Sequence, residues 1–108
     1  MFFGCTALTG NISTWDVSGV TSFRDTFRGC AVFNSPLGTW DVSGCFNFAQ
    51  MFHGANSFNQ PLESWDTSSA TSLNQMFRDA SDFNQSLNSW DVSNVISFYG
   101  VFKNADSY

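Results

Sequence analysis

The residues best placed to do chemistry are four aspartates that recur every 25 residues: Asp16, Asp41, Asp66 and Asp91. Carboxylates stacked in a row repel one another unless something compensates. A serine follows each aspartate two positions later, and its hydroxyl and backbone N–H can hydrogen-bond the carboxylate. Ca²⁺ between neighbouring carboxylates is the alternative, although it takes about six to eight oxygen ligands. We expect hydrogen bonds to hold the row without a metal.

No other grouping of residue types indicates catalysis. The one histidine, His53, shares its repeat position with two arginines and a lysine, where a cation favourably faces the C-terminus of a predicted helix. No nucleophile recurs beside it in a Ser-His-Asp arrangement. The cysteines lack the C-x-x-C spacing of a zinc site. We therefore predict no catalytic residue, no cofactor and no enzyme activity.

Cysteine and asparagine positions suggest two modifications. Cys5 and Cys30 stand one period apart, so stacking would bring them within disulfide distance. Later repeats place alanine there, which fits a tight site for a small side chain equally well, so a disulfide and buried thiols both stay open. Cys45 is expected in the core. Of two Asn-x-Ser sequons, Asn11 is the reasonable glycosylation acceptor, because Asn84 belongs to an asparagine row that we expect to be buried.

A row of hydroxyl side chains raises a third possibility, ice binding by a regular array. The row mixes two residue types, and Phe46 and Ile96 interrupt the neighbouring row, so this signal is weak. Its members are Thr14, Thr39, Ser64 and Ser89.

All these residues are positioned by a repeat of 25 residues without insertion or deletion, marked by Trp15, Trp40, Trp65 and Trp90. A fixed period in this range is typical of a solenoid, in which each coil hides its apolar face against its neighbours. We expect one domain, 1–108, that belongs to a longer array. Its parts are a partial coil at 1–11 and repeats at 12–36, 37–61, 62–86 and 87–108.

Within a repeat, two periodicities follow one another. The alternation in Trp40-Asp41-Val42-Ser43 predicts a short strand with Trp and Val inward. Apolar residues four apart, such as Phe48 and Phe52, then predict a short helix. The helix should end at residues that tolerate the left-handed conformation, namely Gly29, Gly54, Asp79 and Asn104. The predicted fold is an α/β, leucine-rich-repeat-like solenoid of about four coils, each a strand, a short helix and a loop, curved with the strands on the concave side.

Aromatic side chains are expected to form the core. The 108 residues include 13 Phe and 4 Trp, and each such ring buries about 150–250 Å². The predicted structural ladder adds one phenylalanine per repeat to the tryptophans: Phe27, Phe52, Phe77 and Phe102. Rings at the two ends, namely Phe2, Trp15, Trp90 and Phe102, should be less shielded than Phe52 and Trp65.

Net charge and hydropathy limit the classes of partner that we expect. A net charge of −5 disfavours nucleic acid and anionic membranes, and no apolar run is long enough for a membrane span. Met1-Phe2 is in phase with Met51-Phe52, so we interpret it as repeat sequence rather than a signal peptide. Neither end carries a polar capping element. We therefore expect protein partners or further repeats at the open ends, within a larger assembly.

The segment Met51–Ser68, with its Met-Phe-x-Gly-Ala, Phe-Asn-Gln and Trp-Asp-x-Ser elements, resembles the repeat of mycoplasma-type surface lipoproteins. That repeat has no assigned function and is usually grouped with BspA-like leucine-rich repeats of surface antigens. The resemblance covers essentially the whole chain and brings no catalytic residues. It implies an extracellular or cell-surface setting and an adhesive or scaffolding role. We expect a non-enzymatic structural or protein-interaction module; the alternative is a protein that binds Ca²⁺ or a glycan on the concave Asp/Ser rows.

Overall fold

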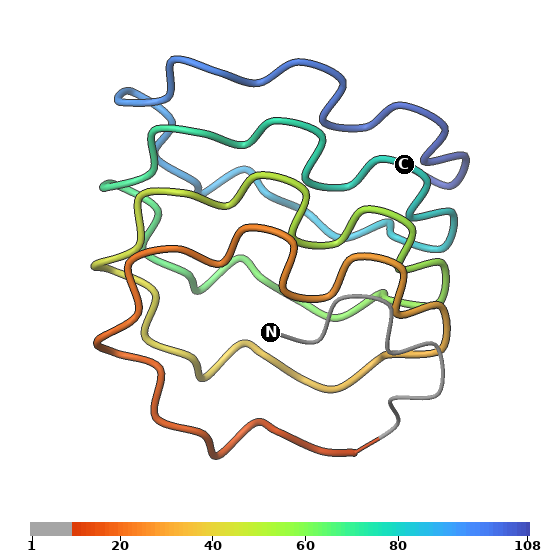
Figure 1. The fold of residues 1–108 in the computed structure, drawn as a ribbon, viewed down its shortest axis with the longest axis horizontal. Helices are drawn as coiled ribbons and strands as arrows, with labels where there is room; N and C mark the ends of the chain where they lie inside the picture. The colour runs from red at the N-terminus through yellow and green to blue at the C-terminus, as the bar shows by residue number, and fades with distance from the viewer. Residues whose placement is uncertain (1–9) are drawn as a thin grey trace.

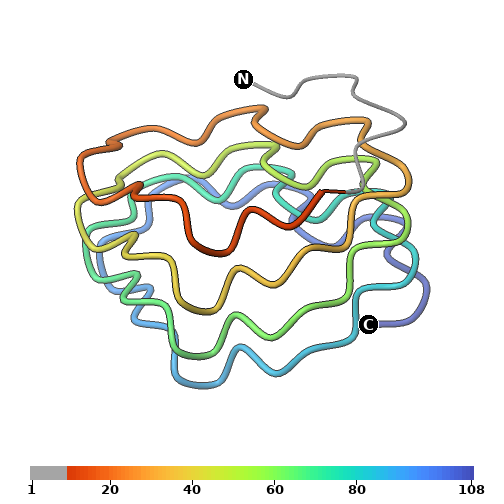
Figure 2. The same cartoon turned by 90° about the horizontal axis from the view of Figure 1, so that it is seen from below.

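A computed structural model of the chain describes residues 10–108. The chain winds into coils that lie one above another, so that residues one repeat apart are neighbours (Figures 1 and 2). The described residues form no helix and no extended strand. Regular pairing is limited to isolated parallel bridges, which join Ser22, Asn47, Ser72 and Ser97 in that order.

The predicted α/β, leucine-rich-repeat-like solenoid of strand, short helix and loop is therefore wrong. Residues 49–54, expected to be helical, form a run of tight turns. The helix is broken because Gln50 has a φ of 58°, and Asp25, Gln75 and Gly100 at the same position have φ values of 60°, 54° and 61°. A left-handed residue cannot continue a right-handed α-helix.

Each of these segments consists of successive β-turns. The amide of Thr26 donates to the carbonyl of Phe23 at 3.1 Å, and the amide of Cys30 donates to the carbonyl of Phe27 at 3.1 Å. The third residue of each turn has a positive φ, as in a type II turn. The spacing of four between Phe23 and Phe27 thus reflects two turns. The left-handed conformation predicted at Gly29, Gly54, Asp79 and Asn104 is confirmed by φ values of 73°, 73°, 59° and 60°.

Alternate amides of the turns pair each coil with the next. Phe48, Gln50, Phe52 and Gly54 donate to the carbonyls of Ser72, Asn74, Met76 and Arg78 at 3.0, 2.8, 2.9 and 2.8 Å. The equivalent amides one coil earlier and one coil later make the same bonds, at 2.8–3.1 Å. Because these bonds run between coils, the backbone of a turn is satisfied only when its neighbour is present.

The Trp-Asp-Val-Ser segment also differs from its prediction, because it forms no strand. Its inward and outward alternation is nevertheless correct. Trp40 and Val42 are buried, and Asp41 is exposed. Without helices and strands of unequal width, the physical reason for a curved stack with a concave strand face is absent.

Aromatic rings form continuous columns through the stack. In one column, the ring centroids of Phe27, Phe52, Phe77 and Phe102 follow one another at 5.7, 5.4 and 5.6 Å. In a second column, those of Phe33, Phe58, Phe83 and Tyr108 are 5.8, 6.1 and 5.8 Å apart. The two columns contact each other within a coil, as in the 4.2 Å pair of Phe52 and Phe58. Stacking at these distances stabilises the structure beyond simple area burial.

The tryptophans form hydrogen bonds between neighbouring coils. The indole N–H of Trp65 donates to the carbonyl of Leu37, in the preceding coil, at 2.8 Å. Trp40 and Trp90 make the equivalent bonds to Ile12 and Leu62 at 3.1 and 2.9 Å. The predicted ladder is thus both an apolar column and a hydrogen-bonded one.

The prediction about the ends is confirmed for the described residues. Trp15 is 45% exposed and Phe102 is 36% exposed, against 3% for Trp65 and 0% for Phe52. Trp90 is half-buried. Phe2 lies outside the described residues.

Replacing Trp65 by alanine removes a buried ring and its bond to the preceding coil. We expect Trp65→Ala to lower the free energy of unfolding by about 3–5 kcal/mol. Trp15→Ala is the matched control and should cost clearly less, because that ring is already 45% exposed. Urea unfolding followed by near-ultraviolet circular dichroism measures both. Equal losses in the two variants would contradict the buried ladder.

Candidate functional site

The four aspartates lie on the surface, one in each coil, and each is held by its own coil. Oδ1 of Asp66 accepts the amide of Ser68 at 3.0 Å and its hydroxyl at 2.6 Å. The other three aspartates make the same two bonds with their own serines at 2.6–3.1 Å. The arrangement is an Asx turn. The predicted hydrogen bonding within the coil is confirmed.

These bonds also favour the ionised form of the four aspartates. The hydroxyl of Ser68, followed by its amide, lowers the pKa of Asp66 below its usual value. The corresponding serines lower the pKa of Asp16, Asp41 and Asp91 in the same way. Burial and the neighbouring aspartates oppose this effect on Asp41, and the serine bonds outweigh them. The row is therefore ionised at neutral pH, and local donors offset its self-repulsion.

The row offers few further ligands to a cation. Within residues 10–108, no group of three or more His, Cys, Asp and Glu side chains is arranged to hold a metal ion. The serine hydroxyl beside each carboxylate donates its proton to that carboxylate. Calcium at Asp16, Asp41, Asp66 and Asp91 would therefore depend on carboxylate oxygens and water for most of its ligands.

His53 is a packing residue at a junction between coils. Its Nε2 lies 3.3 Å from Oδ2 of Asp79, while its buried Nδ1 has no hydrogen-bond partner among the described residues. Burial lowers the pKa of His53, and the charge of Arg28 adds to this, outweighing the opposite effect of Asp79. The imidazole is thus neutral at pH 7. Because no helix ends here, the predicted interaction of His53 with a helix dipole is wrong.

The cysteines are packing residues in the described part of the chain. Cys30 and Cys45 are both fully buried, which confirms the core position predicted for Cys45. Burial raises the pKa of the Cys45 thiol, so it stays protonated and is a poor nucleophile at neutral pH. Cys5 lies outside the described residues, and with it the candidate disulfide to Cys30.

The asparagine row joins loops of successive coils. The amide of Asn59 donates to Oδ1 of Asn34 at 2.9 Å, and the amide of Asn84 donates to Oδ1 of Asn59 at 2.9 Å. The prediction that Asn84 is buried is wrong, because it is exposed, as is Asn11. Burial therefore does not distinguish the two sequons.

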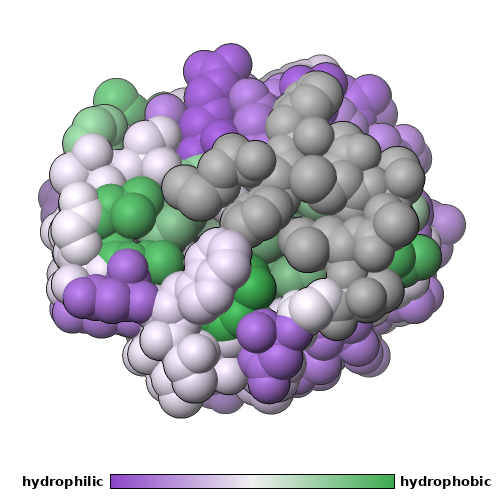
Figure 3. Space-filling model, turned by 60° about the horizontal axis from the view of Figure 1, so that its bottom comes forward, coloured by the Kyte–Doolittle hydropathy of each residue, from purple (hydrophilic) through white to green (hydrophobic). Residues whose placement is uncertain are grey.

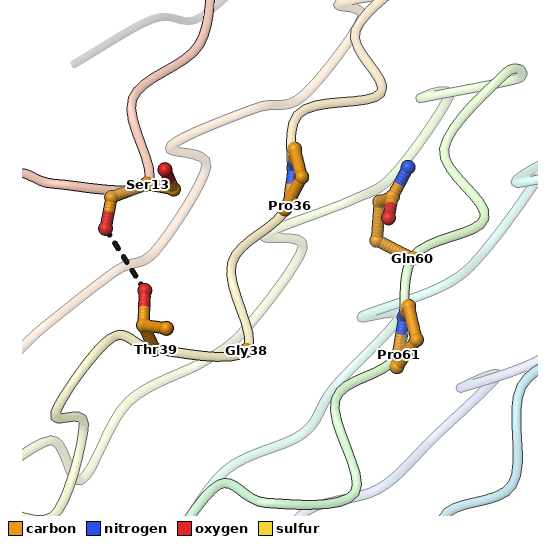
Figure 4. A pocket seen from close by; sticks show the side chains of 6 residues that line it. All are labelled: Ser13, Pro36, Gly38, Thr39, Gln60 and Pro61. Atoms are coloured by element: carbon orange, nitrogen blue, oxygen red, sulfur yellow. Dashed lines mark hydrogen bonds between the residues drawn. The ribbon is translucent and has the colours of Figure 1, made fainter.

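The hydroxyl row is exposed, and three of its members bond to the neighbouring coil. Thr39, Ser64 and Ser89 donate their hydroxyl protons to backbone carbonyls of the preceding coil at 2.9, 2.7 and 2.5 Å. Beside this row, residues of the repeats 12–36 and 37–61 line a shallow hollow of about 380 Å³ without a charged side chain (Figure 4). Its lining residues are Ser13, Pro36, Gly38, Thr39, Gln60 and Pro61. The hollow offers no catalytic group.

Several large apolar side chains of the last coil are exposed to solvent. Phe98 is 66% exposed, whereas Phe23 and Phe48 at the same repeat position are 1% and 0% exposed. Val92 is 51% exposed and Val42 is 1% exposed. Within residues 10–108, no coil lies over these side chains. We define the terminal apolar face as Val92, Phe98, Phe102 and Tyr108.

The terminal apolar face is hollowed. A depression of about 210 Å³ lies between Trp90, Val92, Phe102 and Tyr108, and a second of about 210 Å³ adjoins Phe98. Figure 3 views the opposite end of the stack, where apolar surface is also visible beside the grey residues. Contiguous exposed apolar surface of this kind commonly marks an interaction site.

Comparison with known proteins identifies a family. A family model described as "Mycoplasma protein of unknown function, DUF285" matches residues 1–108. No curated protein and no solved structure matches the chain. These findings give no support to the expected relationship with BspA-like leucine-rich repeats. Within residues 10–108, no helix has the length and apolar character to cross a membrane.

Calcium tests the aspartate row directly. Because the Ser68 bonds already stabilise the Asp66 carboxylate, we expect calcium to leave the melting temperature unchanged. Ser68→Ala should lower the melting temperature with or without calcium, since the carboxylate loses its hydroxyl donor. Differential scanning calorimetry in calcium and in EDTA measures both effects. A rise of several degrees that EDTA reverses would favour the ligand-binding alternative.

Proposed function

The chain belongs to the Mycoplasma family DUF285, and we propose that it is a non-enzymatic structural or protein-interaction module of a surface, secreted or assembly-associated protein. The observation that carries this proposal is the terminal apolar face, where Phe98 is 66% and Tyr108 is 52% exposed. Phe23 and Phe48 hold the same repeat position as Phe98 and are 1% and 0% exposed. A protein contact that covers them buries apolar surface at about 25 cal/mol per Å².

The hydrogen bonds made by the repeated polar residues support the same proposal. The repeated hydroxyl, amide and indole groups bond carbonyls or amides of a neighbouring coil. The repeated aspartates bond the serines of their own coil. Among the described residues, no serine or cysteine is activated by a histidine, and the one histidine contacts Asp79. Repetition here serves cohesion between coils, which suits a scaffold better than an enzyme.

Sedimentation velocity over a wide concentration range tests the proposal. We expect the chain to associate reversibly as its concentration rises, because association buries the terminal apolar face. The double variant Val92→Ser/Phe98→Ser should shift this association to concentrations at least about tenfold higher. Both side chains are more than half exposed, so the variant should keep its fold.

Val32→Ser is the matched control, because Val32 is 47% exposed but lies outside the terminal apolar face. The next repeat carries Ser57 at this position, so serine suits the backbone there. The control should associate like the parent chain. A parent chain that stays monomeric at high concentration, or a double variant that associates like the control, would contradict the proposal.

A further inference from the structure

We propose that the terminal apolar face binds one further coil of the same 25-residue repeat. This inference rests on the proposed function and names the partner that the face fits. Its basis is continuity: the last coil presents the same groups that each described coil below it uses to hold its successor.

The first group is a row of backbone donors. At three successive junctions, four alternate amides of a turn donate to carbonyls of the next coil. On the last coil the equivalent amides belong to Phe98, Gly100, Phe102 and Asn104. Within residues 10–108, none of these four amides donates a backbone hydrogen bond. A partner must therefore supply a row of carbonyls at the same spacing, because burying these donors without acceptors is unfavourable.

The second group is a set of backbone carbonyls that accept hydrogen bonds from particular side chains of the next coil. The carbonyl of Leu62 accepts the amide of Trp65 and the indole N–H of Trp90 in the next coil. The carbonyl of Leu87 accepts the amide of Trp90 and has the same second position to offer. The carbonyl of Glu63 accepts the hydroxyl of Ser89, and Asn88 occupies that position on the last coil. An incoming segment thus needs a hydroxyl residue directly followed by tryptophan.

The third group is aromatic. In covered coils the tryptophan of the following coil packs over two phenylalanines: Trp65 lies 5.7 Å from Phe48 and 6.5 Å from Phe52, centroid to centroid. Trp40 packs in the same way over Phe23 and Phe27, at 5.5 and 6.0 Å. On the last coil this place lies over Phe98 and Phe102, which are 66% and 36% exposed. The face therefore selects a tryptophan in register with the amide row.

Two other occupants fit less well. A lipid surface would cover the rings but leave the four amides without acceptors. A symmetric contact between two copies of the turn segment 98–104 would set a row of N–H donors against an identical row. A coil of the repeat satisfies the rings and the amides together.

A synthetic peptide with the sequence of residues 59–83 tests the inference. This segment begins one residue after Phe58, as an added coil would begin one residue after Tyr108, and it contains Ser64-Trp65. Fluorescence anisotropy of the labelled peptide measures binding to the full chain, at a concentration where the chain is monomeric. We expect saturable binding that the Trp65→Ala peptide weakens at least about tenfold.

Chain variants locate the binding site. Phe98→Ser should weaken peptide binding at least about tenfold, and Val32→Ser should leave it unchanged. Binding that is insensitive to Trp65→Ala in the peptide, or to Phe98→Ser in the chain, would overturn the inference. So would absence of binding by a chain whose self-association still depends on Val92 and Phe98, and that result would leave the proposed function standing.

Discussion

The structure depends on one interaction, the hydrogen bond from a turn amide to a carbonyl of the next coil. It recurs at alternate residues, as from Phe52 to Met76 at 2.9 Å and from Gly54 to Arg78 at 2.8 Å. The turns have too few internal bonds to satisfy their own backbone, so a single coil is unstable alone. The same constraint fixes the register, which brings equivalent rings within 5.4–6.1 Å of each other in the two phenylalanine columns.

This dependence on neighbours links the fold to the proposed function. A covered coil has its amides, rings and side-chain donors satisfied along the stack, and its outward residues are mainly polar. The last described coil presents the same groups, and within residues 10–108 no coil lies over them, so Phe98 is exposed whereas Phe48 is buried. The binding capacity that we infer is therefore a consequence of the repeat itself. No additional site residue is needed, and the aspartate row is already stabilised by its serines.

The sequence predicted the period, the inward rings and the left-handed residues Gly29 and Gly54, because identical spacing and residue type report these directly. It failed on the helix. Phenylalanines four apart fit a helix face and two consecutive turns equally well, and the deciding residue, Gln50, is not one whose type signals a positive φ. That conformation is imposed by bonds to the next coil, including Gln50 Nε2 to Gln75 Oε1 at 2.8 Å. The exposure of Asn84 was missed for a related reason: a partner on the next coil does not require burial. The terminal apolar face was only partly foreseen, through Phe102, because the spacing of the repeat does not report how far Val92 and Phe98 are exposed.

Native-state hydrogen exchange, followed residue by residue by NMR, tests the central claim most directly. The account predicts slow exchange for the amides of Phe48, Gln50, Phe52 and Gly54, which donate to the next coil. It predicts fast exchange for the equivalent amides of Phe98, Gly100, Phe102 and Asn104 in the monomeric chain, despite the same local turn sequence pattern. Equal protection of the two sets, or fast exchange of both, would show that bonds between coils do not hold this structure together.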